Sequence, residues 1–394
     1  MDDVFKVSLL TAGKDKPYVL GLLSGLVVNK LHVEFIGNDD MQHAEMVRHE
    51  NVTYFNLREN QDADVPIQRK VHRVLRYYLK LLRYAYQTDS PLFHIQWLNK
   101  FIYFDRTLLN CYYKLLGKRL VYTAHNVNMG ARDGNDSIFN MATLSFLYRV
   151  MDHVIVHTEK MKAEIVETYR IPEEKVSVIP FGINNTVPNS PLTPREARER
   201  LSLQPDDKTM LFFGNIAPYK GLEYIIMALG ELKEKYPSLK LMIAGRIKEC
   251  NSYWIKIETL IDQYEVADRI LKNVYFIPDE DIEIYFKAAH VLVLPYKFIY
   301  QSGPLFLSYY YGLPVIASDV GSFREDIKEG ETGFICAAED SKDLAEKIQQ
   351  YFESDLYHNL EKHRCSIRAY AEVKYSWEKI GKNTRGIYEQ VLRQ

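Results

Sequence analysis

The chain is organised by a rhythm of short apolar segments separated by stretches of helical length. In the first half these β-rich segments are Val4–Leu10, Leu31–Ile36, Val52–Leu57, Leu92–Trp97, Arg119–Ala124, His153–His157 and Val176–Pro180. Strands that alternate with helices form a parallel sheet covered on both faces. The rhythm therefore predicts a Rossmann-like α/β domain over residues 1–185.

The same rhythm begins again after an interruption. Residues 186–208 are rich in proline, asparagine, serine and charge, and they are expected to link two domains, with a short helix at Pro194–Leu201. The later apolar segments are Met210–Phe213, Leu239–Ala244, Val274–Ile277, Val291–Leu294, Val315–Ala317 and Gly333–Cys336. They predict a second Rossmann-like domain over residues 209–372, followed by a last helical segment over residues 373–394.

Composition excludes some classes of function. The formal net charge of −2 over 394 residues gives no general attraction to nucleic acid. Cys111, Cys250, Cys336 and Cys365 lack metal-ligand spacing, which favours reduced thiols and a cytoplasmic protein. The acidic start shows no signal peptide, and no apolar run is long enough to cross a bilayer. We expect a cytoplasmic protein, at most on the inner face of a membrane.

The stretch Tyr296–Gly321 contains the sharpest local signal. An apolar segment leads into Gln301, Ser302, Gly303 and Pro304, and an aromatic segment of helical length follows. Free N–H groups and the helix dipole make such a helix start a site for phosphate. The alternative is an ordinary strand-to-helix junction.

Two further loops of the second half carry cations after predicted strands. Gly214 and Asn215 lead to Lys220 at a helix start, and Arg246 follows the next strand. Each cation taken alone is more often a solvated surface charge. Because ligands bind at the carboxyl ends of parallel strands, the three loops together predict a diphosphate site.

The first half offers two weaker signals at the same kind of position. The loop around Gly13 follows the first strand and is a candidate cradle for a ligand, and His125 with Asn126 follows the fifth. A single histidine there is also consistent with a structural hydrogen-bonding role.

Taken in order, several motifs resemble one enzyme family. They are His125-Asn126, Val178–Ile183, Phe213-Gly214-Asn215 through Lys220-Gly221, Gly312–Ala317, Asp319-Val320-Gly321 with Glu325, and Glu331–Phe334. The chain resembles the retaining GT-B glycosyltransferases of group 1, family 4, which include sucrose-phosphate synthases and bacterial enzymes of polysaccharide assembly. The resemblance implies an acceptor-binding first domain, a donor-binding second domain, a cleft between them and a last helix that returns to the first domain.

The resemblance also implies roles for particular residues. His125 is expected to orient the donor sugar, and Lys220 matches the phosphate-binding lysine. The co-substrate is expected to be a UDP- or GDP-linked sugar, used without a cofactor, and the activity that of a hexosyltransferase in cell-surface polysaccharide or glycolipid assembly. The residues expected to bind substrate are Gly13, Asn126, Gly214, Asn215, Arg246, Ile277, Gln301, Ser302, Gly303, Pro304 and Glu325.

The chain departs from the family pattern at three positions. Asn215 replaces a basic residue, so Arg246 is expected to supply part of the positive charge. Ile299 and Leu307 stand where the family has two glutamates. Either Gln301 and Ser302 make the hydroxyl contacts, or donor recognition has changed, or the chain no longer catalyses.

The expected chemistry is stabilisation of a departing diphosphate by positive charge. Lys220, Arg246 and the amides near Gly303 are the candidates. The loops carry no Asp-x-Asp motif, and we expect metal-independent transfer. The rival hypotheses are a sugar-nucleotide epimerase or phosphorylase, for which no distinctive signal is present, and a non-catalytic subunit that binds sugar or a partner.

A basic helix is predicted between Arg69 and Ala85. The apolar residues on one face are Val71, Leu75, Tyr78 and Leu82, and the basic residues on the other are Arg69, Arg73, Arg76, Lys80 and Arg83. The helix either packs on the core with a solvated basic face, or attracts an anionic membrane surface and a membrane-linked acceptor.

Overall fold

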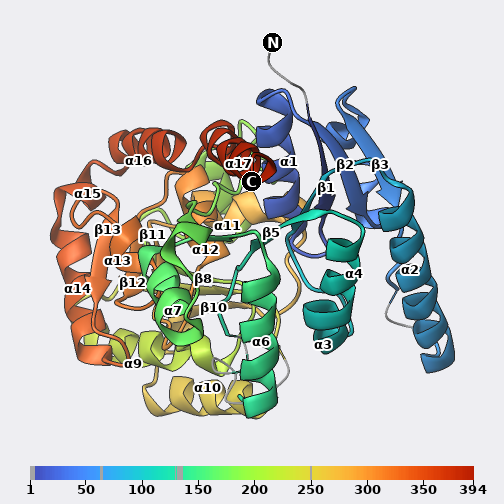
Figure 1. The fold of residues 1–394 in the computed structure, drawn as a ribbon. Helices are drawn as coiled ribbons and strands as arrows, with labels where there is room; N and C mark the ends of the chain where they lie inside the picture. Colours follow the sequence, from blue (N-terminus) through green and yellow to red (C-terminus); the bar gives the residue numbers. More distant parts are fainter. Residues whose placement is uncertain (1–4, 63–64, 129, 131–135, 249–250) are drawn as a thin grey trace. The chain divides into compact units, whose positions relative to one another are not determined.

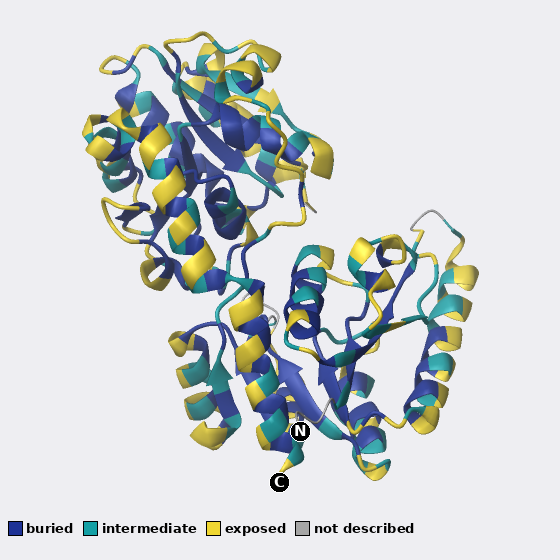
Figure 2. Cartoon of the chain, turned by 90° about the horizontal axis from the view of Figure 1, so that it is seen from above, coloured by how far each residue is buried: buried dark blue, intermediate teal, exposed yellow. Residues whose placement is uncertain are grey.

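The structure, a computed structural model, describes residues 5–62, 65–128, 130, 136–248 and 251–394. Two compact units emerge from its contacts: unit 1 comprises residues 1–182 and 375–394, and unit 2 comprises residues 183–374. Each unit has a buried sheet with exposed outer helix faces (Figure 2). Of the cysteines, Cys111, Cys336 and Cys365 are free thiols, and Cys250 lies outside the described residues.

Unit 1 is a seven-stranded parallel sheet in the order β3-β2-β1-β4-β5-β6-β7. The strands are β1 (Lys6–Leu10), β2 (His32–Gly37), β3 (Val52–Asn56), β4 (Leu92–Ile95), β5 (Arg119–Thr123), β6 (His153–Val156) and β7 (Val176–Val178). The helices include α1 (Lys16–Val28), α2 (Ile67–Gln87), α3 (Ile102–Phe104), α4 (Asn110–Leu115), α6 (Ile138–Val150), α7 (Glu159–Tyr169) and α17 (Trp377–Leu392). Strand order reverses between β1 and β4, so ligands are expected outside the carboxyl ends of these two strands.

Unit 2 is a six-stranded parallel sheet in the order β10-β9-β8-β11-β12-β13. The strands are β8 (Lys208–Phe213), β9 (Leu239–Ala244), β10 (Ile270–Asn273), β11 (Val291–Leu294), β12 (Val315–Ser318) and β13 (Gly333–Cys336). The helices include α8 (Pro194–Arg200), α9 (Leu222–Leu232), α10 (Asn251–Gln263), α11 (Ile282–Ala288), α12 (Gly303–Tyr310), α13 (Phe323–Asp326), α14 (Ser341–Glu353), α15 (Asp355–His358) and α16 (Leu360–Tyr375). Its order reverses between β8 and β11.

The prediction of two Rossmann-like parallel sheets is confirmed, but one predicted strand is wrong. The strand expected at Val274–Ile277 lies four residues earlier, at β10, where Ile270 to Asn273 pair with the end of β9. Tyr275 N–H turns back to the Asn273 carbonyl, which ends the strand. Ile277 is therefore in the loop that follows β10, where its side chain is buried.

The stretch expected to link the domains packs onto unit 2. Glu283 accepts hydrogen bonds from the Ser190 N–H (2.8 Å) and hydroxyl (2.7 Å), and Tyr311 donates to the Pro188 carbonyl (2.5 Å). Helix α8 begins with a capping box in which Thr193 and Glu196 bond reciprocally. This segment is thus fixed by side chains of the second sheet's helices.

The last helix, α17, lies beside α1 in unit 1 (Figure 1). The two backbones meet at glycines: a Cβ at Gly25 would lie 2.1 Å from the Trp377 carbonyl oxygen, and one at Gly381 would lie 2.2 Å from the Gly25 oxygen. Across the same contact, the Asn29 side chain donates to the Glu378 carbonyl, and the Arg385 guanidinium donates to the Asn29 carbonyl. Residues from the end of the chain therefore complete the first sheet's helical layer.

Helix α2 differs from the sequence expectation in the face it buries. Val71 and Leu75 were expected on one apolar face with Tyr78, yet they are 53 % and 50 % exposed. The helix buries Tyr77, Tyr78, Leu81, Tyr84 and Ala85 instead. The buried face is thus turned about the helix axis from the expected one, and an apolar stripe stays in solvent beside the basic face. Among the described residues, no helix has the length and apolar content needed to cross a membrane.

Candidate functional site

Three loops of unit 2 meet at the point where its strand order reverses. A Cβ at Gly214, after β8, would lie 3.0 Å from Lys220 Nζ and 3.9 Å from Pro304 Cγ. A Cβ at Gly245, after β9, would lie 1.9 Å from the Gly214 carbonyl oxygen. The structure thus brings together Gly214, Lys220, Pro304 and the Gly245-Arg246 loop.

Lys220 is a buried cation, 6 % exposed, at the centre of this group. Its Nζ lies 5.2 Å from the centre of the Tyr296 ring. Burial lowers the pKa of Lys220, and the positive charge of Lys248 lowers it further. Among the described residues, no carboxylate pairs with its Nζ. An anionic ligand would supply the missing negative charge.

The N-terminus of α12 lies beside Lys220 and is uncapped. Ser302 occupies the N-cap position, but its side chain makes no capping hydrogen bond. A Cβ at Gly303 would meet no atom within 4 Å, so the space beside the first residue of the helix is open. Pro304 has no N–H and the Leu305 N–H donates to the Ser302 carbonyl at 3.1 Å, so the Gly303 N–H and the positive end of the helix dipole form the candidate anion site next to a buried lysine.

Three polar side chains before this helix have buried oxygens without a hydrogen-bond partner. The Gln301 side-chain oxygen is buried without a partner. The hydroxyls of Ser302 and Tyr296 are buried near each other without a hydrogen bond of good geometry. Buried polar groups are normally bonded, so these groups are available to a ligand rich in hydroxyls.

Arg246 and Asn215 flank the anion site. Arg246 Nε lies 3.4 Å from Asn215 Oδ1, and its guanidinium carbon lies 5.7 Å from the centre of the exposed Phe276 ring. The guanidinium is exposed and keeps N–H groups for a phosphate or a base edge.

The positions of the absent glutamates contain no carboxylate. Leu307 is buried in α12, and the Ile299 carbonyl packs on Gly321, where a Cβ would lie 2.3 Å from it. Glu325 is exposed on α13, and its carbonyl accepts a hydrogen bond from Lys374. A role for Glu325 in binding substrate stays a prediction.

His125 lies after β5 in unit 1 and is 6 % exposed. Its ring stacks on Trp97, with ring centres 4.3 Å apart and planes 9° apart, and meets Tyr18 edge to face. Burial and the neighbouring histidines hold the pKa of His125 well below its usual range. The imidazole is therefore neutral at physiological pH. Asn126 beside it is partly exposed.

A hydrogen-bonded chain across neighbouring strands fixes the His125 tautomer. His157 Nδ1–H donates to the Ile179 carbonyl at 2.9 Å. Burial lowers the pKa of His157 to about 4, so its Nε2 is an acceptor, and His125 Nδ1–H donates to it at 3.0 Å. His125 Nε2 thus keeps its lone pair, and the nearest Gln96 atom, the side-chain oxygen at 3.3 Å, does not donate to it.

The hydrogen-bonded network also includes residues that the sequence analysis did not single out. The Gln96 amide also contacts His94 Nε2 at 2.8 Å, and His94 Nδ1 lies 2.5 Å from the Tyr388 hydroxyl of α17. Gln96, His125, His157 and Ile179 follow β4, β5, β6 and β7 in sheet order. The position after an apolar strand was a signal for His125 and His157, but His94 lies within β4 and no signal in the sequence linked Tyr388 to it.

The Gly13 loop follows β1 in a left-handed conformation. Ala12, Gly13 and Asp15 have φ values of 52°, 65° and 45°. A Cβ at Gly13 would lie 3.2 Å from Asn38 Nδ2 and 3.3 Å from Arg58 Cδ. The loop therefore lies against residues that follow β2 and β3.

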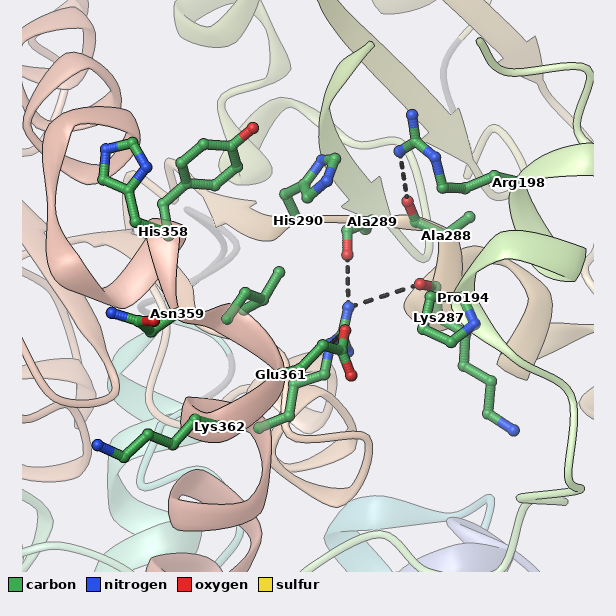
Figure 3. Close-up of a pocket in the computed structure, with 13 residues that line it drawn as sticks. Pro194, Arg198, Lys287, Ala288, Ala289, His290, His358, Asn359, Glu361 and Lys362 are labelled. Atoms are coloured by element: carbon green, nitrogen blue, oxygen red, sulfur yellow. Dashed lines mark hydrogen bonds and ion pairs between the residues drawn. The ribbon is translucent and has the colours of Figure 1, made fainter. Parts of the chain in front are cut away.

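A separate pocket of about 480 Å³ lies at the opposite edge of the second sheet (Figure 3). It lies before β11 rather than after it. Its buried Arg364 donates to the carbonyls of Tyr311 and Ala289, at the ends of α12 and α11, and Arg198 donates to the Ala288 carbonyl. These arginines neutralise helix C-termini, which gives the pocket a structural explanation.

Two family models match most of the chain. The model "Glycosyl transferases group 1" matches residues 194–372, and "Glycosyltransferase Family 4" matches residues 17–187. An uncharacterized glycosyltransferase of Methanocaldococcus jannaschii is 27 % identical over 239 residues, 60 % of this chain and 59 % of that protein. A D-inositol 3-phosphate glycosyltransferase of Acidothermus cellulolyticus is 23 % identical over 62 % of this chain and 54 % of its own. The match thus spans little more than half the length of these curated relatives.

Solved structures share the fold over nearly the whole chain. Sucrose-phosphate synthase from Thermosynechococcus elongatus superposes with a TM-score of 0.76 at 19 % identity, covering 99 % of each chain. HepE of Anabaena, in complex with UDP and glucose, superposes with a TM-score of 0.74 at 18 % identity, covering 98 % of this chain and 100 % of its own. The predicted GT-B fold class is confirmed.

Proposed function

The chain belongs to the group 1, family 4 glycosyltransferases, and from that premise we propose that it is a hexosyltransferase using a nucleotide-diphosphate sugar. Unit 2 binds the donor and unit 1 binds the acceptor, whose hydroxyl receives the sugar. The observation that carries this proposal is Lys220, a buried lysine without a carboxylate partner beside an uncapped helix N-terminus.

Lys220 and the Gly303 N–H at the start of α12 bind the diphosphate in this proposal. Negative charge builds on the diphosphate as the bond to the sugar breaks, and positive groups already in place lower the barrier. Arg246 contributes to the same charge balance from the loop after β9. The three together support transfer without a metal, which activity in excess EDTA would test.

The neutral state of His125 suits its proposed role in orienting the sugar. The sugar carbon gains positive charge in the transition state. A protonated imidazole would oppose that charge, whereas a neutral ring fixed by His157 does not. Retention of the anomeric configuration remains part of the proposal from the family resemblance, and proton NMR of the product would test it.

The donor hydroxyl contacts are assigned in this proposal to Gln301 and Ser302. Both side chains have oxygens without hydrogen-bond partners in the loop that precedes α12. In place of the two missing carboxylates, these neutral side chains would make the hydrogen bonds to the hydroxyls of the donor sugar. A solved structure of the same fold holds UDP and glucose, so UDP-linked sugars are the first donors to test, followed by GDP-linked sugars.

The decisive experiment uses Lys220→Met. At 100 times its Kd, UDP should stabilise the wild type by about 2.7 kcal/mol, measured as a rise in Tm. Lys220→Met should lose this rise while its unliganded Tm stays equal or increases, because the variant removes an unpaired buried charge. Lys342→Gln, at an exposed position of α14, is the matched control and should respond to UDP like the wild type.

Turnover separates the roles of the two residues. His125→Ala should keep the UDP-induced rise in Tm and lose release of UDP from the donor sugar. A panel of nucleotide sugars that produces neither a rise in Tm nor hydrolysis with the wild type would contradict the proposal and favour a non-catalytic subunit.

We also propose that α2 places the enzyme on an anionic membrane that contains its acceptor, in cell-surface polysaccharide or glycolipid assembly. Ile67, Val71, Leu75 and Leu79 form a stripe along α2, and each is at least half exposed. The basic residues of the helix flank this stripe, so charge attraction and insertion of apolar side chains act together.

Liposome sedimentation tests the membrane proposal. The wild type should sediment with anionic vesicles, and Leu75→Asp with Leu79→Asp should abolish sedimentation at any salt concentration. Removing only basic residues should weaken it chiefly at low salt. A wild type that stays in the supernatant at low salt would exclude this surface as a membrane contact.

A further inference from the structure

Two cations without carboxylate partners stand together at the carboxyl edge of the first sheet. The Arg58 guanidinium, after β3, donates to the Ala12 carbonyl, and its central carbon lies 4.9 Å from the centre of the Tyr77 ring. These contacts fix the guanidinium and leave its other N–H groups available. No ion pair to Arg58 is present among the residues that the structure describes.

Lys14 is the second cation, in the loop after β1. Its Nζ donates to the Leu98 carbonyl at 3.2 Å and lies 5.8 Å from the centre of the Trp97 ring. Burial first, and then the positive charge of Arg58, lowers the pKa of Lys14. The two cations repel each other, and a bound anion would relieve that repulsion.

Asp105, the carboxylate that acts electrostatically on Lys14, is already engaged in hydrogen bonds. Asp105 accepts hydrogen bonds from the Tyr78 hydroxyl at 2.9 Å and from the Asn99 N–H at 2.5 Å. Burial raises the pKa of Asp105 to about 6, and the carboxylate supplies at most one negative charge to the group. Lys100 adds a further positive charge near Lys14. The group is therefore net positive.

Unpartnered polar atoms accompany the cations. Trp97 Nε1 is buried without a hydrogen-bond partner, and so is the side-chain oxygen of Asn38, a residue 2 % exposed. Asn38 and Arg58 both touch the Gly13 position, and Trp97 stacks on His125. An anion held by Lys14 would thus lie one aromatic ring away from the candidate catalytic histidine.

We propose that the acceptor carries a phosphate group, which Lys14 and Arg58 bind at this edge of the first sheet. The inference rests on the proposed transferase function and names its acceptor class. A fixed guanidinium with free N–H groups and a neighbouring ammonium match the oxygens of a phosphate. The phosphate belongs either to a soluble sugar or polyol phosphate or to a lipid phosphate.

Binding to the UDP-saturated protein tests this site without knowledge of the true acceptor. Filling unit 2 with UDP first removes its own anion site from the measurement. Phosphorus NMR should show line broadening of glycerol 3-phosphate or farnesyl phosphate with the wild type. Arg58→Gln and Lys14→Gln should each weaken the binding about tenfold or more, as loss of a charge-assisted bond predicts.

The controls separate charge from folding. Lys382→Gln removes a charge from an exposed position of α17 in the same unit and should bind like the wild type. Arg58→Lys keeps the charge without the guanidinium fork and should show an intermediate affinity. Each variant should keep the UDP-induced rise in Tm, since UDP binds the other unit.

Two arms distinguish the sources of the phosphate. Broadening of glycerol 3-phosphate alone supports a soluble acceptor, and broadening of farnesyl phosphate alone or more strongly supports a lipid acceptor. No broadening of either compound, or broadening that Arg58→Gln and Lys14→Gln leave unchanged, would overturn the inference. If UDP also fails to bind, the proposed function itself fails; if UDP binds, only the phosphate site fails.

Discussion

At the residue scale, the two candidate residues at the centre of the chemistry occupy contrasting environments. Lys220 is buried beside the uncapped N-terminus of α12 without a carboxylate partner, whereas His125 is held by rings on two sides and by a hydrogen bond to His157. Lys220 is therefore suited to bind an anion, and His125 is held in one orientation.

His157 should act as a positioning residue for His125. His157→Phe removes the acceptor for His125 Nδ1–H, and turnover should fall about 10–100-fold, the range for loss of a supporting hydrogen bond. His157→Gln offers an amide oxygen to the same N–H and should recover most of the activity. Steady-state kinetics checks both variants, and an unchanged rise in Tm with UDP shows that the donor site is intact.

The buried histidines of unit 1 should make its stability depend on pH. Burial lowers the pKa of His94 to about 3 and of His153 and His157 to about 4. Below about pH 6.5 these imidazoles bind protons in the unfolded chain but not in the folded protein. Their contribution to stability is therefore complete above pH 6.5. Below pH 6.5 the free energy of unfolding falls by up to about 1.4 kcal/mol per pH unit for each histidine.

Asp105 acts in the opposite direction. Because its pKa is raised to about 6, protonation of its carboxyl in the folded state stabilises the protein as the pH falls through 6. The stability gained by protonating Asp105 offsets only part of the stability lost through the three histidines. Thermal unfolding should therefore show a lower Tm at pH 5 than at pH 7.5, and a Tm that rises on acidification would contradict this account.

Sequence reasoning at this scale identified residues that directly follow strands. Lys220, Arg246 and His125 were found because a polar residue after an apolar run marks the carboxyl edge of a sheet. Gln96 and His157 were missed as partners of His125, and Tyr388 as a partner of His94, because these contacts depend on which strands are neighbours and on a helix nearly 300 residues from His94. Arg58 was missed for the same reason.

At the element scale, the contact between α1 and α17 depends on glycines. Substitutions at two glycines of α17 are expected to have opposite effects on stability. Gly381→Val should destabilise the protein by about 1–3 kcal/mol or more, since its Cβ would meet the backbone of Gly25. Gly386→Ala, where a Cβ would meet nothing within 4 Å, should stabilise it by about 0.5–1 kcal/mol. Chemical denaturation measures both, and equal effects would contradict the packing described.

Helix existence was predictable at this scale, but helix rotation was not. The apolar spacing of α2 predicted a helix, and its bounds lie within two residues of those expected. Periodicity alone could not decide which apolar face of the helix is buried, because Val71 and Leu81 are both apolar and only Leu81 lies in the core. The exposed stripe was therefore visible only in the structure.

At the scale of the whole molecule, the two units differ in how the chain builds them. Unit 2 is continuous, residues 183–374, whereas unit 1 needs residues 375–394 as well. Residues 183–374 expressed alone should fold and keep the UDP-induced rise in Tm. Residues 1–182 alone should unfold at a lower temperature than the same segment with residues 375–394 attached through a flexible linker. Circular dichroism and thermal unfolding measure these outcomes.

The return of α17 to α1 also sets an order for synthesis. Domains usually mature from the N-terminal end as the chain leaves the ribosome. Here the final helix leaves the ribosome after all of unit 2. The α1 surface around Gly21 and Gly25 therefore stays uncovered until the second sheet has been synthesised. The half of the protein that begins earliest is the one that is finished last, and nascent chains halted before residue 375 would present that uncovered surface to chaperones.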